Sequence, residues 1–160
     1  MGVAGSGKST LAVALARQLG RPCLEGDEFH GDANRAKMAR GEPLTDADRA
    51  SWLAALCEQL QRHPGALLAC SALKRSYREQ LRAASPGLRF AFLDITPGEA
   101  RQRVNERGGH FFVASLMDSQ FDALEPPTGE PGVLRLDALR PLAALQAQVA
   151  GWLAAPSSES

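Results

Sequence analysis

A motif near the amino end of the sequence constrains the fold more than any other feature. Residues 2–9 read GVAGSGKS and match the pattern G-x-x-x-x-G-K-[ST] in full. Glycines at this spacing let the backbone wrap around an anion with its N–H groups pointing inward, and the helix that follows presents its positive end. A glycine-rich turn that precedes a helix by chance is a weaker explanation, because the lysine and the serine also stand at the required positions.

This loop defines an expected nucleotide site. Lys8 should lie near the β- and γ-phosphates of a nucleoside triphosphate, and the hydroxyl of Ser9 should bind Mg²⁺. The residues that we expect to bind the nucleotide are Gly2, Val3, Ala4, Gly5, Ser6, Gly7, Lys8, Ser9 and Thr10.

The rest of the chain alternates short apolar runs with longer stretches of helical periodicity. We expect helices over 8–19, 45–62, 75–84, 96–107, 115–124 and 142–152, and strands over 22–25, 66–70, 90–95 and 133–136. Residues 125–131 are rich in proline and predict a connector. The alternation is typical of an α/β domain with a mostly parallel sheet.

The length and the composition narrow the classes of function. The 160 residues suit one domain, which we expect over 1–153, followed by a flexible tail over 154–160. Basic and acidic residues number 18 each, which argues against nucleic acid or an acidic membrane surface as a partner. Three cysteines without C-x-x-C spacing predict reduced, buried thiols. No apolar run approaches the ~18 residues of a membrane span, so we expect a cytoplasmic protein.

Charged side chains follow two of the predicted strands. Glu25 and Asp27 should emerge at the carboxyl edge of the sheet beside the phosphate loop, unless they are solvated acids of an ordinary turn. Lys74 and Arg78 are four residues apart at the start of a helix, where positive charge is unfavourable. A substrate carboxylate would relieve that misfit, although a solvated basic face explains the spacing as well.

Two further arginines stand beside a pair of glycines. Arg103 and Arg107 are four residues apart and immediately precede Gly108 and Gly109. This pattern predicts a hinged, cationic lid over about 103–115 that brings guanidinium charge onto the phosphates. The alternative is an amphipathic helix with solvated arginines on its surface.

Four sequence blocks together carry a resemblance to a known family. They are EGDEFH at 25–30, GEPLTD at 41–46, CSALK at 70–74 with YR at 77–78, and GHFF at 109–112. In this order the chain resembles the gluconokinase family, a shikimate-kinase-like branch of the P-loop kinases, from Gly2 to about Pro127. Glu25 stands where many relatives carry aspartate, which keeps the carboxylate and lengthens its reach.

The resemblance implies a three-layer α/β P-loop kinase fold with a parallel sheet, and it exposes one departure. The phosphate loop of such kinases follows a central strand, but here only Met1 precedes Gly2, so the first strand is absent. Two neighbouring strands should then face a gap with unpaired backbone groups. We therefore expect the natural protein to begin about ten residues earlier, the length of a strand and its approach.

The resemblance also implies an activity, which is ATP-dependent phosphorylation of D-gluconate to 6-phosphogluconate with Mg²⁺. It implies that Asp27 accepts or orients the proton of the attacking hydroxyl and that Ser9 and Glu25 serve the metal. The implied catalytic residues are Lys8, Asp27, Arg103 and Arg107, and the implied substrate ligands are Asp27, His30, Ser71, Lys74 and Arg78. His30 could equally cap the loop that follows it.

Two rival functions stay open at this point. One is a kinase for another small anion, such as shikimate or a nucleotide, and the other is an inactive nucleotide-binding module. The sequence leaves open the preference among sugar acids and whether the chain forms a homodimer.

Overall fold

The computed structural model of the chain describes residues 1–108 and 111–155, and of residues 111–114 the backbone alone. The helices are α1 Lys8–Leu19, α2 Asp32–Ala39, α3 Asp46–Arg62, α4 Arg75–Ala84, α5 Pro97–Glu106, α6 Phe111–Ala123 and α7 Leu142–Ala154, with a 3₁₀ helix η1 at Gly26–Phe29. The strands are β1 Cys23–Glu25, β2 Leu67–Ala69, β3 Phe90–Asp94 and β4 Val133–Asp137.

Local signals explain where several helices begin and end. Helix α1 ends at Gly20, which adopts a left-handed conformation with φ of 62° and so terminates the helix in the way glycine permits. Thr45 and Thr96 each accept a hydrogen bond from the backbone three residues later and complete a capping box, with Asp48 and Glu99 respectively. The predicted starts of α3 and α5 are therefore confirmed.

Two predictions were wrong in detail, and one helix was not predicted. Helix α2 was not expected, because its eight residues lack an apolar stripe and tertiary contacts hold it instead, including the ion pair of Lys37 with Asp48 on α3. Helix α6 begins at Phe111, four residues before the expected start at Ser115. Cys23 is exposed rather than buried, since it opens β1 at an edge of the sheet.

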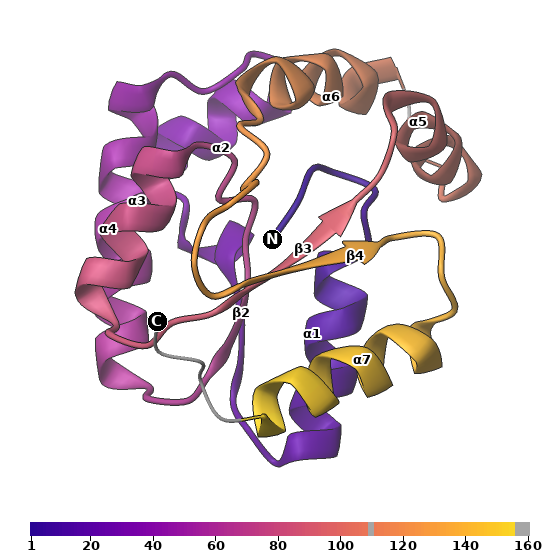
Figure 1. Cartoon of the computed structure of the whole chain (residues 1–160). Coiled ribbons are helices and arrows are strands. Elements are labelled where there is room, and N and C mark those ends of the chain that lie inside the picture. Colours follow the sequence, from indigo (N-terminus) through magenta and orange to yellow (C-terminus); the bar gives the residue numbers. More distant parts are fainter. Residues whose placement is uncertain (109–110, 156–160) are drawn as a thin grey trace.

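The strands form two parallel pairs in place of one continuous sheet. Cys23, Leu24 and Glu25 of β1 align with Leu67, Leu68 and Ala69 of β2, while β3 pairs with β4 from Phe90 opposite Val133 onward. Met1 lies between the pairs, as Figure 1 shows at the amino end of the chain. The gap predicted at the centre of the sheet is confirmed.

The fold has three layers, because helices cover both faces of the strands and an apolar core lies on each face. On one face, α1 and α7 lie side by side and bury Leu11, Leu15 and Val149 against Leu93 and Leu136 of the strands. On the other face, α3 and α4 enclose the second core, which contains Trp52, Leu53, Leu56, Leu60, Tyr77, Leu81, Phe90 and Phe92. The structure is thus the α/β architecture that the sequence predicts. In the described residues, none of the helices has both the length and the hydropathy to cross a membrane.

Candidate functional site

The phosphate loop is a turn that only glycine can form at several positions. Gly2, Gly5 and Gly7 have φ of 149°, 79° and 94°, a region that side chains disfavour. A Cβ atom at Gly5 would also lie 2.9 Å from the carbonyl oxygen of Ala100 on α5. The loop is therefore packed closely against α5, and the glycine at position 5 is needed for that approach.

Lys8, Ser9 and Glu25 lie at the start of α1 and at the end of β1. The Nζ atom of Lys8 donates to the carbonyl oxygen of Val3 at 2.9 Å. Burial lowers the pKa of Lys8, while the nearby carboxylate of Asp27 acts in the opposite direction. The hydroxyl of Ser9 donates to the carboxylate of Glu25, so the two predicted Mg²⁺ residues are in direct contact.

These oxygens suit Mg²⁺, which prefers hard oxygen ligands and keeps several waters. Among the described residues, no cluster of three or more His, Cys, Asp or Glu side chains could hold a metal ion by itself. A cation at Ser9 and Glu25 would thus need phosphate oxygens and water to complete its coordination, as expected for a nucleotide-bound Mg²⁺.

A pocket of about 130 Å³ brings together residues that are far apart in the sequence. The predicted substrate and catalytic residues that line this pocket are Lys8, Asp27, His30 and Ser71. The other lining residues are Ala4, Met38, Pro43, Leu44, Arg49, Trp52, Leu116, Ser119 and Gln120. This pocket opens beside the phosphate loop, so a molecule bound in it would face the terminal phosphate of a nucleotide.

His30 is held in one position by its neighbours. Its ring stacks on Trp52 with centroids 4.8 Å apart and an interplanar angle of 9°, and the amide of Asn34 lies 3.4 Å from its Nδ1 atom. Trp52 is itself fixed by a 2.8 Å hydrogen bond to the carbonyl oxygen of Gly26. Burial lowers the pKa of His30, an effect that the carboxylate of Asp27 opposes. The neutral ring can therefore exchange hydrogen bonds with hydroxyl groups.

Lys74 lies in an adjoining pocket of about 620 Å³, which shares Pro43, Leu44, Arg49 and Ser119 with the first. Its Nζ atom contacts both carboxylate oxygens of Asp46, at 2.8 and 2.9 Å. The hydroxyl of Tyr77 donates to the same carboxylate. These hydrogen bonds, with that of Lys74 the largest effect, lower the pKa of Asp46. The ammonium group of Lys74 thus lines the pocket, but the carboxylate of Asp46 balances part of its positive charge.

Arg78 corrects one prediction. Its side chain is fully buried, and its guanidinium donates to the carboxylate of Glu130 and to the carbonyl oxygens of Ala72, Leu73 and Glu125. These contacts use all five N–H groups of the guanidinium. Arg78 therefore does not reach the pocket as a substrate ligand, and instead ties the segment after β2 to the connector before β4.

Sequence reasoning missed two side chains of the pockets. Arg49 is half-buried, lines both pockets and lies with its Cζ atom 5.9 Å from the ring centroid of Tyr77. In the described residues, no carboxylate forms an ion pair with it. The Oε1 atom of Gln120 accepts a 2.7 Å hydrogen bond from the N–H of Ala4 in the phosphate loop. Nothing distinguishes Arg49 or Gln120 in sequence from other polar residues of α3 and α6.

A third cavity, of about 300 Å³, lies on the other side of the phosphate loop. Arg103 reaches over the loop, donating to the carbonyl oxygen of Ala138 at 2.7 Å and lying 3.5 Å from that of Ser6. The hydroxyl of Ser6 is buried without a hydrogen-bond partner in the described part of the chain. The lining residues are Ser6, Gly7, Thr10, Leu11, Arg103, Glu106, Arg107, Ala138, Arg140, Leu142 and Leu145.

This cavity fits a nucleotide, because it is continuous with the phosphate loop, carries three arginines and offers an unsatisfied buried hydroxyl. Ala138, Arg140 and Leu142 were not predicted, since they follow the last strand in a segment without a motif. Of the predicted lid over 103–115, residues 109 and 110 lie outside the described residues, as do 156–160 of the predicted tail.

Comparisons with known proteins agree with this geometry. The sequence model of a family described as "AAA domain" matches residues 1–127. The chain is 50% identical over 141 residues to a gluconokinase of Gluconobacter oxydans, covering 85% of this chain and 79% of the relative. It is 44% identical over 147 residues to the thermoresistant gluconokinase of Escherichia coli, covering 89% and 84%.

A solved structure extends the likeness to three dimensions. The crystal structure of a gluconokinase from Sinorhizobium meliloti superposes with a TM-score of 0.85 at 44% identity and covers 96% of this chain and 92% of that one.

Proposed function

Because the chain belongs to the gluconokinase family of P-loop kinases, a phosphotransferase family with an alcohol acceptor, we propose that it phosphorylates gluconate with ATP at the site described above. One observation carries the proposal for the site. Lys8 of the phosphate loop lines the same pocket as Asp27, His30 and Ser71. The residues proposed to bind the sugar acid therefore lie beside the lysine proposed to bind the phosphates of ATP.

The nucleotide would lie across the phosphate loop. Its phosphates would meet the backbone N–H groups of residues 2–9 and the ammonium of Lys8, while the base would enter the cavity of Ala138, Arg140 and Leu142. Ser9 and Glu25 would hold Mg²⁺, which when bound neutralises charge on the phosphates. Arg103 already lies against the loop, and Arg107 lines the same cavity, so both are placed to add positive charge.

The sugar acid would lie in the two joined pockets. Asp27 would accept the proton of the attacking hydroxyl, while His30 and Ser71 would contact other hydroxyl groups. We assign the substrate carboxylate to Arg49 and Lys74, because these cations line the wider pocket whereas Arg78 is buried against Glu130. Gln120 would give up its hydrogen bond with Ala4 when a phosphate takes that N–H.

Several expectations remain predictions. They are the extent of the domain over 1–153 with a lid over 103–115, the cytoplasmic location, the absence of a nucleic-acid or membrane partner, and the open question of a homodimer.

The proposal is tested by measuring ADP release with gluconate, shikimate and AMP as separate acceptors. We expect ADP release that depends on gluconate. Asp27→Asn keeps the shape of the side chain and removes its basicity, so turnover should fall by at least the ~10²-fold typical of a lost general base, while nucleotide binding is kept.

Glu28→Gln is a matched control, because Glu28 is an exposed neighbour that does not line the pocket. Full turnover in Asp27→Asn, or a preference for shikimate or AMP, would contradict the proposal. Nucleotide binding without any ADP release would favour an inactive binding module.

A further inference from the structure

Gln120 of α6 lies between the phosphate loop and the pocket proposed for the sugar acid. Its Oε1 atom accepts the 2.7 Å hydrogen bond from the N–H of Ala4, and both residues line that pocket. In the described part of the chain, no acceptor takes a hydrogen bond from its Nε2 atom, which is not buried. The amide nitrogen is therefore free to donate to a molecule in the pocket.

The packing of α6 holds Gln120 at this position. Met117 is 1% exposed and belongs to the same apolar core as Val3 of the phosphate loop. Gln120 follows Met117 by three residues, so the two side chains share one face of the helix. An ion pair between Asp118 and Arg101 also connects α6 to α5. The hydrogen bond to the loop is thus supported by contacts of the whole helix.

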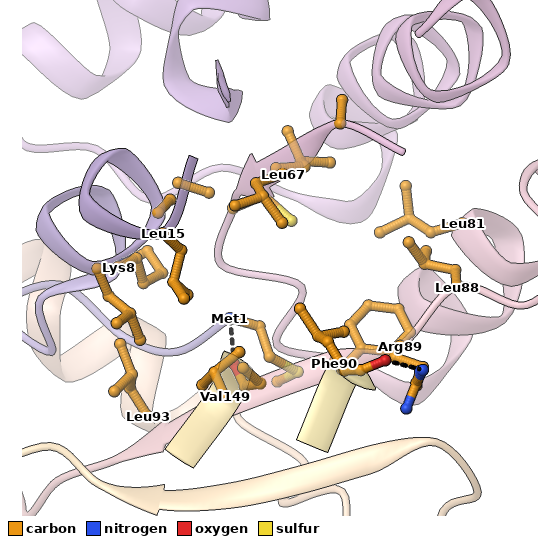
Figure 2. A pocket seen from close by; sticks show the side chains of 18 of the residues that line it. Met1, Lys8, Leu15, Leu67, Leu81, Leu88, Arg89, Phe90, Leu93 and Val149 are labelled. Atoms are coloured by element: carbon orange, nitrogen blue, oxygen red, sulfur yellow. Dashed lines mark hydrogen bonds between the residues drawn. The ribbon is translucent and has the colours of Figure 1, made fainter. Parts of the chain in front are cut away.

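One peptide group of the loop is held by two side chains. The Nζ atom of Lys8 donates to the carbonyl oxygen of Val3, while Gln120 accepts from the N–H of Ala4, so both bond to the same peptide. The C=O and N–H of a trans peptide point in opposite directions. Figure 2 shows the side chain of Lys8 next to Leu93 of β3, so the lysine comes from the side of the strands and Gln120 from α6.

Different residues of the loop line its two sides. Ala4 and Lys8 line the pocket proposed for the sugar acid. Ser6 and Gly7 line the cavity proposed for the nucleotide instead. The phosphate that is transferred must lie on the side of the sugar acid, because its phosphorus atom has to meet the attacking hydroxyl. The N–H of Ala4 is therefore the loop donor at the γ-phosphate end, and Gln120 occupies the position of a γ-phosphate oxygen.

We propose that Gln120 is a ligand of the γ-phosphoryl group of ATP during its transfer to the acceptor hydroxyl. When a phosphate oxygen accepts the N–H of Ala4, rotation of the Gln120 amide lets Nε2 donate to the same phosphoryl group. The bond from the γ-phosphorus to its bridging oxygen breaks and leaves its electron pair on ADP. A bond to the acceptor oxygen forms, and the acceptor proton passes to Asp27. The donor from Gln120 stabilises the charge on the phosphoryl oxygens throughout this step.

This inference rests on the proposed function, and its first test measures nucleotide binding alone. Titration calorimetry compares ADP with the non-hydrolysable triphosphate AMP-PNP. Gln120→Glu keeps an acceptor for the N–H of Ala4, but it removes the amide donor and places a negative charge beside the γ-phosphate. We expect the Kd for AMP-PNP to rise about tenfold or more, and the Kd for ADP to stay within about threefold. Gln148→Glu is the matched control, because Gln148 is exposed on α7 and should leave both constants unchanged.

The second test measures steady-state turnover with gluconate in Gln120→Leu. The kcat should fall about tenfold or more with little change in KM for gluconate, because the lost hydrogen bond is made to the phosphoryl group. A side chain that only shapes the loop would weaken ADP and AMP-PNP equally in Gln120→Glu, and that result would overturn the proposal. Unchanged affinity for AMP-PNP, or an unchanged kcat in Gln120→Leu, would overturn it as well.

The two tests separate this inference from the proposed function. If the parent protein releases no ADP with gluconate, the proposed function is wrong, and the binding of AMP-PNP and ADP alone decides the role of Gln120. If the parent protein is active and Gln120→Glu binds AMP-PNP as the parent does, only the inference on Gln120 is wrong.

Discussion

Arg49 is the residue on which the proposed recognition of the sugar acid depends most. It lies between the two joined pockets, and no ion pair with a described carboxylate competes for its charge. Arg49→Met keeps the length of the side chain and removes the charge. We expect KM for gluconate to rise about 10- to 100-fold, from the 1.5–3 kcal/mol of a lost charged hydrogen bond, with a smaller change in kcat.

Steady-state kinetics measure this change, and Arg62→Met is the control on the same helix. Arg62 is exposed and pairs with Glu58 at the far end of α3. An unchanged KM in Arg49→Met would exclude Arg49 as a substrate ligand.

His30 should make the stability of the fold depend on pH. Its pKa is lowered in the folded state, chiefly by burial, so protonation favours the unfolded chain. Its contribution is therefore complete above the unfolded pKa of about 6.5 and is lost as the pH falls from there toward the folded pKa. Urea unfolding at pH 7.5, 6.5 and 5.5 should show a smaller loss of stability in His30→Gln than in the parent protein.

His63→Gln is the control for this measurement, because His63 is an exposed residue at the end of α3. A loss of stability in His30→Gln as steep as that of the parent protein would contradict the prediction.

At the scale of elements, the ion pair of Arg78 and Glu130 connects α4 to the connector before β4. Both side chains are buried, at 0% and 6% exposure. Arg78 also holds the carbonyl of Ala72, whose φ of 44° is unusual for a residue with a side chain. Glu130→Gln leaves a buried guanidinium without its counter-charge, so we expect a loss of about 3 kcal/mol or more in the free energy of unfolding.

Denaturant titration measures this loss, with Glu79→Gln as the control. Glu79 pairs with Arg75 on the exposed face of the same helix, where the loss should stay below about 0.5 kcal/mol. Similar losses in both variants would contradict a structural role for the buried pair. Because the segment after β2 carries Ser71 and Lys74, Glu130→Gln should also raise KM for gluconate.

At the scale of the whole molecule, the nucleotide cavity joins segments from both ends of the chain. Its lining comes from the phosphate loop, α1, the end of α5, the segment between β4 and α7, and α7 itself. A ligand there should stabilise the entire fold, by about 2.7 kcal/mol at a concentration 100 times its Kd. We expect ADP at that concentration to raise the Tm by roughly 5–10 °C, from ~2–4 °C per kcal/mol.

Differential scanning calorimetry measures the shift in Tm. Lys8→Met should lose most of it, because Lys8 is the phosphate-loop lysine next to the cavity, whereas Lys37→Met on α2, away from both the loop and the cavity, should keep it. An equal shift in both variants would contradict the assignment of the cavity.

The sequence by itself determined the features whose causes are local. The glycines and Lys8 of the phosphate loop, the capping boxes at Thr45 and Thr96, and the glycine that ends α1 each act within a few residues. The alternation of strands and helices follows from the same short-range periodicity. The family blocks pointed to Asp27, His30 and Ser71 as substrate ligands, and the structure brings these three residues into one pocket with Lys8.

Only the tertiary structure decided the features that depend on partners far along the chain. The family resemblance implies that Arg78 is a substrate ligand, whereas in the structure its guanidinium pairs with Glu130, 52 residues later. Arg49 became a pocket residue because α3 packs where the segments around Asp27 and Lys74 converge. The environment of a charged side chain is set by the residues that pack around it in the fold. The local sequence does not indicate which distant residues those will be.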